Sequence, residues 1–199
     1  MRRKWISATL ALGLAWLLAG PAASAEMTST LTLDGLSFIS FGRQQTFPIP
    51  SGSTIRFRFG EPNADGSVPF RIEPGDVSIA PISLAESGGE LRYSLASPAS
   101  GVMRTAEGGR RIDFRAAVDA TLVQAAEQGT YTYSMPFTTE TLKAKSLGGD
   151  LEIEVTGMRL VDGVWYVQLV GATVNQANAF PAPGTAVYTV LSGRFDRIP

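Results

Sequence analysis

The feature that most constrains this chain is an alternation of apolar and polar side chains that recurs along most of its length. In the stretch STIRFRFG (residues 53–60), three apolar residues, Ile55, Phe57 and Phe59, alternate with polar ones. The same alternation occurs over residues 90–95, 111–115, 130–135 and 150–156. Side chains on a β-strand point to opposite faces with a period of two, so each run predicts a strand with one buried and one exposed face.

Glycine-containing turns separate these runs. Asp65-Gly66 and Asp162-Gly163 are strong hairpin signals, because both residues of each pair tolerate the positive φ of tight hairpin turns. Residues 164–170 (VWYVQLV) are apolar on both faces and predict a central strand, with Trp165 in the core. Residues 116–128 fit either a helical turn or a long strand with a bulge.

These patterns predict an all-β fold in a single domain over residues 26–199. The simplest arrangement is an antiparallel β-sandwich of about 8–10 strands with meander hairpins. A closed β-barrel is the alternative, either a lipid carrier or an outer-membrane barrel, because alternation also suits a barrel wall. Against the outer-membrane form, Arg, Pro and Gly interrupt many strands, and the last residue is Pro199 rather than an aromatic residue.

The first 25 residues predict a cleavable signal peptide. They combine a basic start at residues 2–4, an apolar run at 6–20 and an A-x-A exit that ends at Ala25. The apolar run is shorter than the roughly 20 residues that span a bilayer, and no later segment predicts a transmembrane helix. We therefore expect a mature chain that begins at Glu26 and resides in the periplasm, at the cell surface or outside the cell.

The chain contains no histidine and no cysteine. His-based triads, thiol nucleophiles and metal sites built on imidazole or thiolate are therefore excluded. No catalytic motif is present, so we expect a non-catalytic protein without a cofactor. A carboxylate-based hydrolase is the less favoured alternative.

Charge also limits the partners. Removing the three cations of the signal peptide from the 17 basic residues leaves 14 against 18 acidic ones, a net charge of −4. That balance predicts no contact with nucleic acid. We expect a binding or surface-assembly module whose partner is an envelope protein or a glycan, with self-assembly through a strand edge as a further option.

The polar face of the STIRFRFG strand carries Arg56 and Arg58. We expect both to be exposed, so that removing either costs under about 1 kcal/mol. The row Asp150, Glu152 and Glu154 is the natural complement, because both rows repeat every second residue. A ligand site at the two arginines is the less favoured interpretation.

A metal candidate lies in residues 61–67 (EPNADGS), whose N-x-D-G pattern overlaps the middle of a calcium-binding loop. The twelfth position counted from Glu61 is Ile72, where such a loop requires an acid. A hairpin turn is therefore the favoured interpretation, and a calcium site at Glu61, Asn63 and Asp65 is the alternative.

A binding candidate lies in the longest connection, residues 175–184 (NQANAFPAPG). Binding residues concentrate in loops, so Phe180, with Asn175 and Asn178, is the candidate set. The alternative is that Phe180 packs against the end of the domain.

Overall fold

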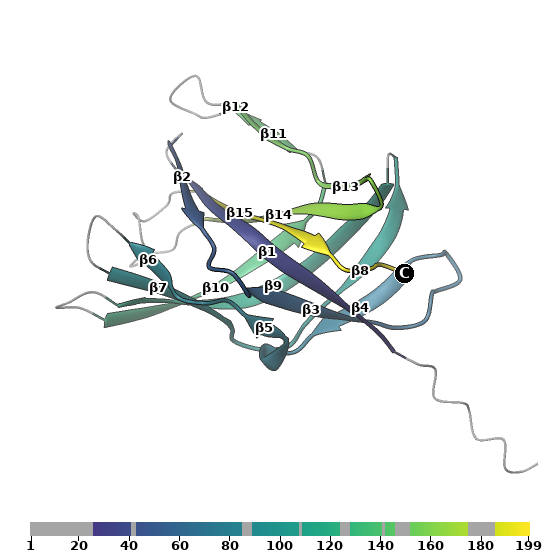
Figure 1. Cartoon of the computed structure of the whole chain (residues 1–199), viewed down its shortest axis with the longest axis horizontal. Helices are drawn as coiled ribbons and strands as arrows, with labels where there is room; N and C mark the ends of the chain where they lie inside the picture. Colours follow the sequence, from purple (N-terminus) through teal and green to yellow (C-terminus); the bar gives the residue numbers. More distant parts are fainter. Residues whose placement is uncertain are drawn as a thin grey trace, which may run out of the picture.

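A computed structural model describes residues 26–40, 43–84, 89–107, 109–123, 128–140, 142–145, 152–174 and 186–199. The predicted signal peptide, residues 1–25, lies outside them. The described chain is almost entirely β-strand, with one short 3₁₀ turn (Figure 1). No helix within these ranges is long and apolar enough to cross a membrane.

The described part contains fifteen strands and one 3₁₀ turn, η1 (Pro74–Asp76). The strands are β1 (Met27–Ser40), β2 (Arg43–Pro48), β3 (Thr54–Phe59), β4 (Val68–Ile72), β5 (Val77–Ser78), β6 (Ile82–Leu84), β7 (Gly89–Leu95), β8 (Ala99–Ala106), β9 (Gly109–Val123), β10 (Gln128–Thr138), β11 (Leu142–Lys145), β12 (Glu152–Val155), β13 (Met158–Val161), β14 (Val164–Val174) and β15 (Ala186–Phe195).

Eight strands close into an antiparallel barrel in the order β1-β3-β4-β8-β9-β10-β14-β15. Closure depends on β10, which pairs with β9 along its length and with β14 at its end. The seam between β10 and β14 is short, with Phe137 opposite Gly171 and Thr138 opposite Val170. The predicted sandwich is therefore wrong, because the sheet closes on itself instead of stacking on a second sheet. The all-β class and the antiparallel pairing are confirmed.

Long strands make this closure possible. β9 pairs with β8 through Gly109–Arg115 and then with β7 through Val118–Val123, so its second half leaves the barrel wall. Together β10, β9, β7 and β6 form an extension sheet beyond the barrel (Figure 1). β1 has a register shift between Leu33 and Gly35, and such a bulge bends a strand. Of residues 116–128, which allowed helix or strand, the described part is strand.

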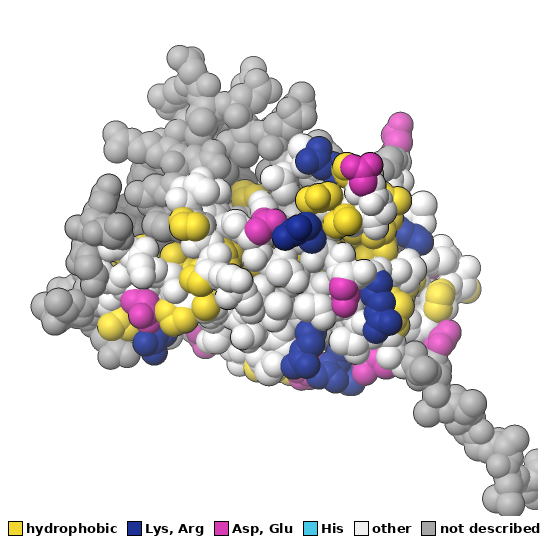
Figure 2. All heavy atoms as spheres, in the orientation of Figure 1, with side chains coloured by type: hydrophobic (Ala, Val, Ile, Leu, Met, Phe, Trp, Pro, Cys, Tyr) yellow, Lys and Arg dark blue, Asp and Glu magenta, His cyan; other side chains and the backbone are white. Residues whose placement is uncertain are grey.

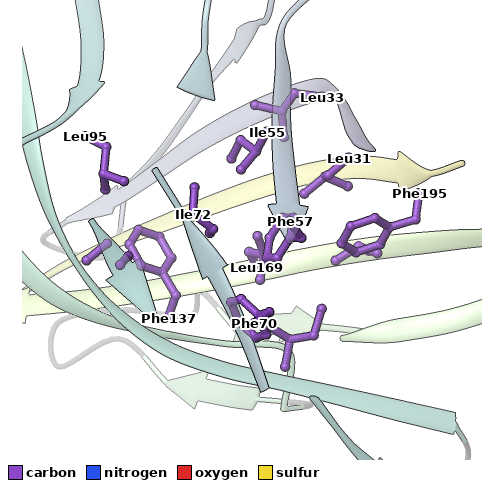
Figure 3. Packing of buried hydrophobic residues seen from close by; sticks show 14 of the residues in the cluster. Leu31, Leu33, Ile55, Phe57, Phe70, Ile72, Leu95, Phe137, Leu169 and Phe195 are labelled. Atoms are coloured by element: carbon purple, nitrogen blue, oxygen red, sulfur yellow. The ribbon is translucent and has the colours of Figure 1, made fainter. Parts of the chain in front are cut away.

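Phenylalanine side chains fill the barrel at the level of Phe57. That ring lies 5.1–6.2 Å from four others, and the set is Phe57, Phe59, Phe70, Phe114, Phe137 and Phe195. Figure 3 shows Phe57, Phe70 and Phe195 converging from β3, β4 and β15. Small barrels are typically filled in this way. The predicted buried face of β3 is confirmed, since Ile55, Phe57 and Phe59 are 6%, 0% and 1% exposed.

The strand predicted as central, residues 164–170, lies in β14 between β15 on one edge and β10 and β13 on the other. Trp165, expected in the core, is half-buried and packs against it. Asp162 and Gly163 form the turn between β13 and β14 with φ values of 50° and 79°. The sequence signal for this hairpin is therefore confirmed.

Candidate functional site

The loop between β3 and β4 holds the calcium candidates in a turn that closes on Ser67. Asp65 Oδ1 accepts hydrogen bonds from the Ser67 backbone N–H at 2.9 Å and from its hydroxyl at 2.6 Å, and Asn63 Nδ2 donates to Ser67 Oγ at 2.9 Å. These Ser67 hydrogen bonds, the hydroxyl's first, lower the pKa of Asp65. Glu61 lies exposed on the same loop. The geometry fits the hairpin interpretation, in which the Asp65 carboxylate closes the loop.

No group of three or more acidic side chains within the described ranges is arranged to hold a metal ion. The loop candidates Asn175, Asn178 and Phe180 lie outside the described residues.

The polar face of β3 carries an ion-pair cluster centred on Asp76, the last residue of η1. Arg58 donates to Asp76 from Nε at 2.6 Å and from Nη2 at 2.8 Å. The Nε of Arg56 lies 3.4 Å from Asp76, and its Nη2 donates to the Gly75 carbonyl at 3.2 Å. The backbone N–H of Glu73 donates to Asp76 Oδ2 at 3.1 Å. Hydrogen bonding from Arg58 chiefly lowers the pKa of Asp76, although desolvation acts in the opposite direction.

This cluster corrects the predicted partner of the two arginines, and it leaves Arg58 half-buried, whereas Arg56 is exposed as expected. Glu152 and Glu154 stand opposite Lys145 and Lys143 in the β11–β12 hairpin, away from β3 in the pairing order. Asp150 lies outside the described residues. Because the donors of the cluster are directed at a carboxylate of the chain itself, we assign it a structural role.

A different surface carries the exposed apolar side chains. Where the structure describes side-chain burial, four large apolar residues are exposed, and all of them come from the β13–β14 hairpin: Leu160, Val161, Val164 and Tyr166, at 54%, 40%, 37% and 36% exposure. Figure 2 shows apolar side chains gathered over β13 and β14, with charged side chains beside them.

Buried residues at its base hold this hairpin on the barrel. Met158, opposite Val167, is 6% exposed, and Trp165 packs against the core. Both meet β9 at Gly109, where an added Cβ would lie 3.3 Å from the Met158 carbonyl oxygen and 3.6 Å from the Trp165 ring. The exposed apolar residues therefore project from a fixed base.

The hairpin also places an aromatic ring between two arginines. Tyr166 is the cross-strand partner of Arg159 on β13 and of Arg194 on β15. Arg194 Nε lies 3.9 Å from Asp34 Oδ2, which is outside hydrogen-bond distance. The Arg159 side chain makes no ion pair or hydrogen bond within the described ranges. We call these three residues, with Val161 and Val164 on the same face, the hairpin surface; Leu160 lies opposite Trp165 on the other face of the hairpin.

A shallow cleft opens beside Tyr166. It is lined by Asp34, Thr156, Gly157, Arg159, Tyr166, Val167, Gln168, Ser192 and Gly193. Gln168 Oε1 accepts hydrogen bonds from the Thr156 backbone N–H at 2.8 Å and from its hydroxyl at 2.9 Å, which fixes one wall. Arginine, glutamine and serine supply donors, and Asp34 is the one acid in this lining.

No family model, curated protein or solved structure matches this chain. Its function must therefore be inferred from its own residues. Sequence reasoning missed the hairpin surface, although Leu160-Val161 carries a signal. Two consecutive apolar residues on a strand point to opposite faces, so one of them must leave the core unless both faces are covered.

Proposed function

We propose that this protein is an exported, non-catalytic binding module of the bacterial envelope, which docks another envelope protein through the hairpin surface. The observation that carries the proposal is that, among the residues whose side-chain burial the structure describes, every exposed large apolar side chain lies on one hairpin. Gathered apolar side chains on a protein surface mark interaction sites. Tyrosine and arginine, represented here by Tyr166 and Arg159, are enriched in such interfaces.

A protein partner suits this surface better than a glycan. Val161 and Val164 gain most when aliphatic side chains of a partner remove them from water. A polysaccharide binds chiefly through hydrogen bonds to its hydroxyl groups and by stacking on aromatic rings, and the aliphatic side chains of Val161 and Val164 provide neither.

Export is supported by the sequence and agrees with where the barrel begins. β1 starts at Met27, two residues after the expected cleavage site at Ala25. Cleavage there would leave every described strand intact.

Other functions have less support. A lipid carrier needs an open lumen, whereas phenylalanine rings fill the barrel around Phe57. An outer-membrane barrel needs an apolar outer band, whereas Arg56, Arg58 and Arg71 occupy the outer faces of β3 and β4. A carboxylate-based hydrolase needs two acids across a cleft, and the cleft beside Tyr166 is lined by Asp34 alone among acids.

Photo-crosslinking in cells tests the proposal. A photoreactive residue at Val161 of the full-length chain should trap one envelope protein, while the same residue at the exposed Thr132, on the polar side of the extension sheet, should not. The trapped protein, once purified, should bind the mature chain, and Val161→Asp or Val164→Asp should abolish binding. Adducts at multiples of the chain's own mass would indicate self-assembly instead. Absence of any adduct specific to Val161 would contradict docking at this surface.

A further inference from the structure

We infer that the docking partner contributes an acidic, extended segment, with one carboxylate on Arg159, a second on Arg194 and an apolar side chain on Tyr166 between them. The inference rests on the proposed function and specifies the chemistry of the partner. It is carried by the row Arg159–Tyr166–Arg194, which crosses three adjacent strands on the outer face.

The charge of this row is unusual for the protein. The mature chain is expected to be acidic, yet two guanidinium groups flank Tyr166, and among the side chains that the structure describes one carboxylate, that of Asp34, lies within 4 Å of either of them. Asp196, the residue after β15, already accepts a hydrogen bond from the Thr30 backbone N–H at 2.8 Å. Asp162 lies at the hairpin turn, on the far side of Val161. An acidic partner would therefore meet a local excess of positive charge.

The spacing of the row indicates the spacing of the carboxylates. Adjacent strands lie about 4.8 Å apart, so the α-carbons of Arg159 and Arg194 are separated by about 10 Å. Residues i and i+4 of an extended segment point to the same side and are about 13 Å apart. Long arginine and glutamate side chains absorb the difference of about 3 Å. The pattern Glu-x-apolar-x-Glu thus places its central side chain over Tyr166.

Asp34 is a competitor within the site. Its carboxylate lies 3.9 Å from Arg194 Nε and must give way when an external carboxylate takes that guanidinium. Neutralising Asp34 should therefore strengthen binding, whereas neutralising Arg159 should weaken it. A non-specific hydrophobic contact predicts neither change.

Nuclear magnetic resonance of the ¹⁵N-labelled mature chain tests the inference, because it detects weak binding residue by residue. The probe is a capped nonapeptide with a Glu-Ser-Leu-Ser-Glu core, and the control peptide has Gln in place of both Glu residues. The Glu peptide should shift the side-chain N–H signals of Arg159 and Arg194, and added salt should weaken its binding.

Matched variants should change the affinity for the Glu peptide by different amounts. Arg159→Gln should weaken binding of the Glu peptide about tenfold, and Asp34→Asn should strengthen it about threefold. Arg92→Gln removes another exposed arginine, on β7, and should leave binding unchanged. Arg159→Lys keeps the charge and should restore part of the affinity. Backbone spectra of each variant verify the fold.

The outcomes separate the two proposals. Equal binding of the Glu and Gln peptides overturns the inference, even if a partner protein is trapped at Val161. Preferential binding of oligogalacturonate at Arg159 also overturns it, in favour of an acidic glycan. If no protein is trapped but the Glu peptide binds as described, the proposed function fails while the acid-binding row stands.

Discussion

Arg58 holds Asp76 by a two-point ion pair on the outer face of the barrel, with Nε and Nη2 at 2.6 and 2.8 Å from the two carboxylate oxygens. The Asp76 side chain is 1% exposed, whereas that of Arg58 is 34% exposed. A carboxylate withdrawn from water to this degree needs strong donors. The pair therefore fastens the turn η1 to β3.

Replacing Arg58 should destabilise the protein more than replacing Arg56. Arg58→Ala removes both short hydrogen bonds and leaves the buried carboxylate of Asp76 without them, whereas Arg56 makes a longer contact of 3.4 Å from a half-exposed side chain. Urea unfolding of the two single variants checks the order. In an Asp76→Ala background the effect of Arg58→Ala should largely disappear, which a double-mutant cycle measures. Equal effects of the two arginines would contradict this role.

The sequence predicts the two faces of β3 but not the partner of its arginines. Alternation determines which side chains share a face, and the burial of Phe57 agrees with it. The partner depends on how η1 folds back onto β3, and Asp76 is an ordinary turn residue in sequence. Periodicity contains no information about that contact. The acidic row at 150–154 was wrongly predicted as the partner of the arginines because its spacing matches theirs.

Stability should fall on acidification, in part through Asp76. Its pKa in the folded protein lies below the ordinary value of 3.8, chiefly because Arg58 donates to the carboxylate. A lowered folded-state pKa contributes stability that is complete above the unfolded-state pKa and is lost as the pH falls through the folded one. The urea midpoint should therefore drop below about pH 4. Asp76→Asn should show a smaller drop, and parallel curves for the two proteins would contradict the assignment.

Phe57 should be among the most sensitive core positions. It is fully buried, and the rings of Phe70 and Phe195 lie 5.1 Å from it. Phe57→Ala should cost about 3–5 kcal/mol of unfolding free energy, because the rigid surroundings leave a cavity. Leu160→Ala removes an exposed side chain from β13 and should change stability by no more than about 0.5 kcal/mol. Urea unfolding that finds Phe57→Ala tolerated would show that the lumen is not packed around this ring.

Calcium should leave the protein unchanged. The Asp65 carboxylate already accepts two hydrogen bonds from Ser67, which close the loop without an ion. Millimolar calcium should therefore not raise the melting temperature of the mature protein. A rise that Asp65→Ala abolishes would support the calcium interpretation instead.

Strands are predictable from this sequence, whereas barrel closure is not. A barrel wall and a sandwich layer both require one apolar face on each strand, so alternation fits either. The choice depends on the seam at Phe137 and Gly171 and on the bulge of β1 near Asp34. The hairpin surface could not be predicted from the sequence for a related reason. In the sequence, Leu160 and Val161 cannot be told from core residues. The structure shows that their hairpin projects beyond the barrel.

The seam itself gives the last prediction. An added Cβ on Gly171 would lie 2.6 Å from both Met135 Sδ and Phe137 Cε1. The Phe137 ring cannot yield easily, because it is buried and stacks on Phe114 with centroids 5.1 Å apart. Gly171→Ala should therefore destabilise by about 1–3 kcal/mol through overpacking.

Gly35→Ala is the control, since its Cβ would make an ordinary contact at 3.6 Å from Ser192 Cβ. Phe137→Leu, which removes the ring, should be less damaging in the Gly171→Ala background than alone. Urea unfolding that finds Gly171→Ala as stable as the unaltered protein would mean that β10 and β14 do not meet as described.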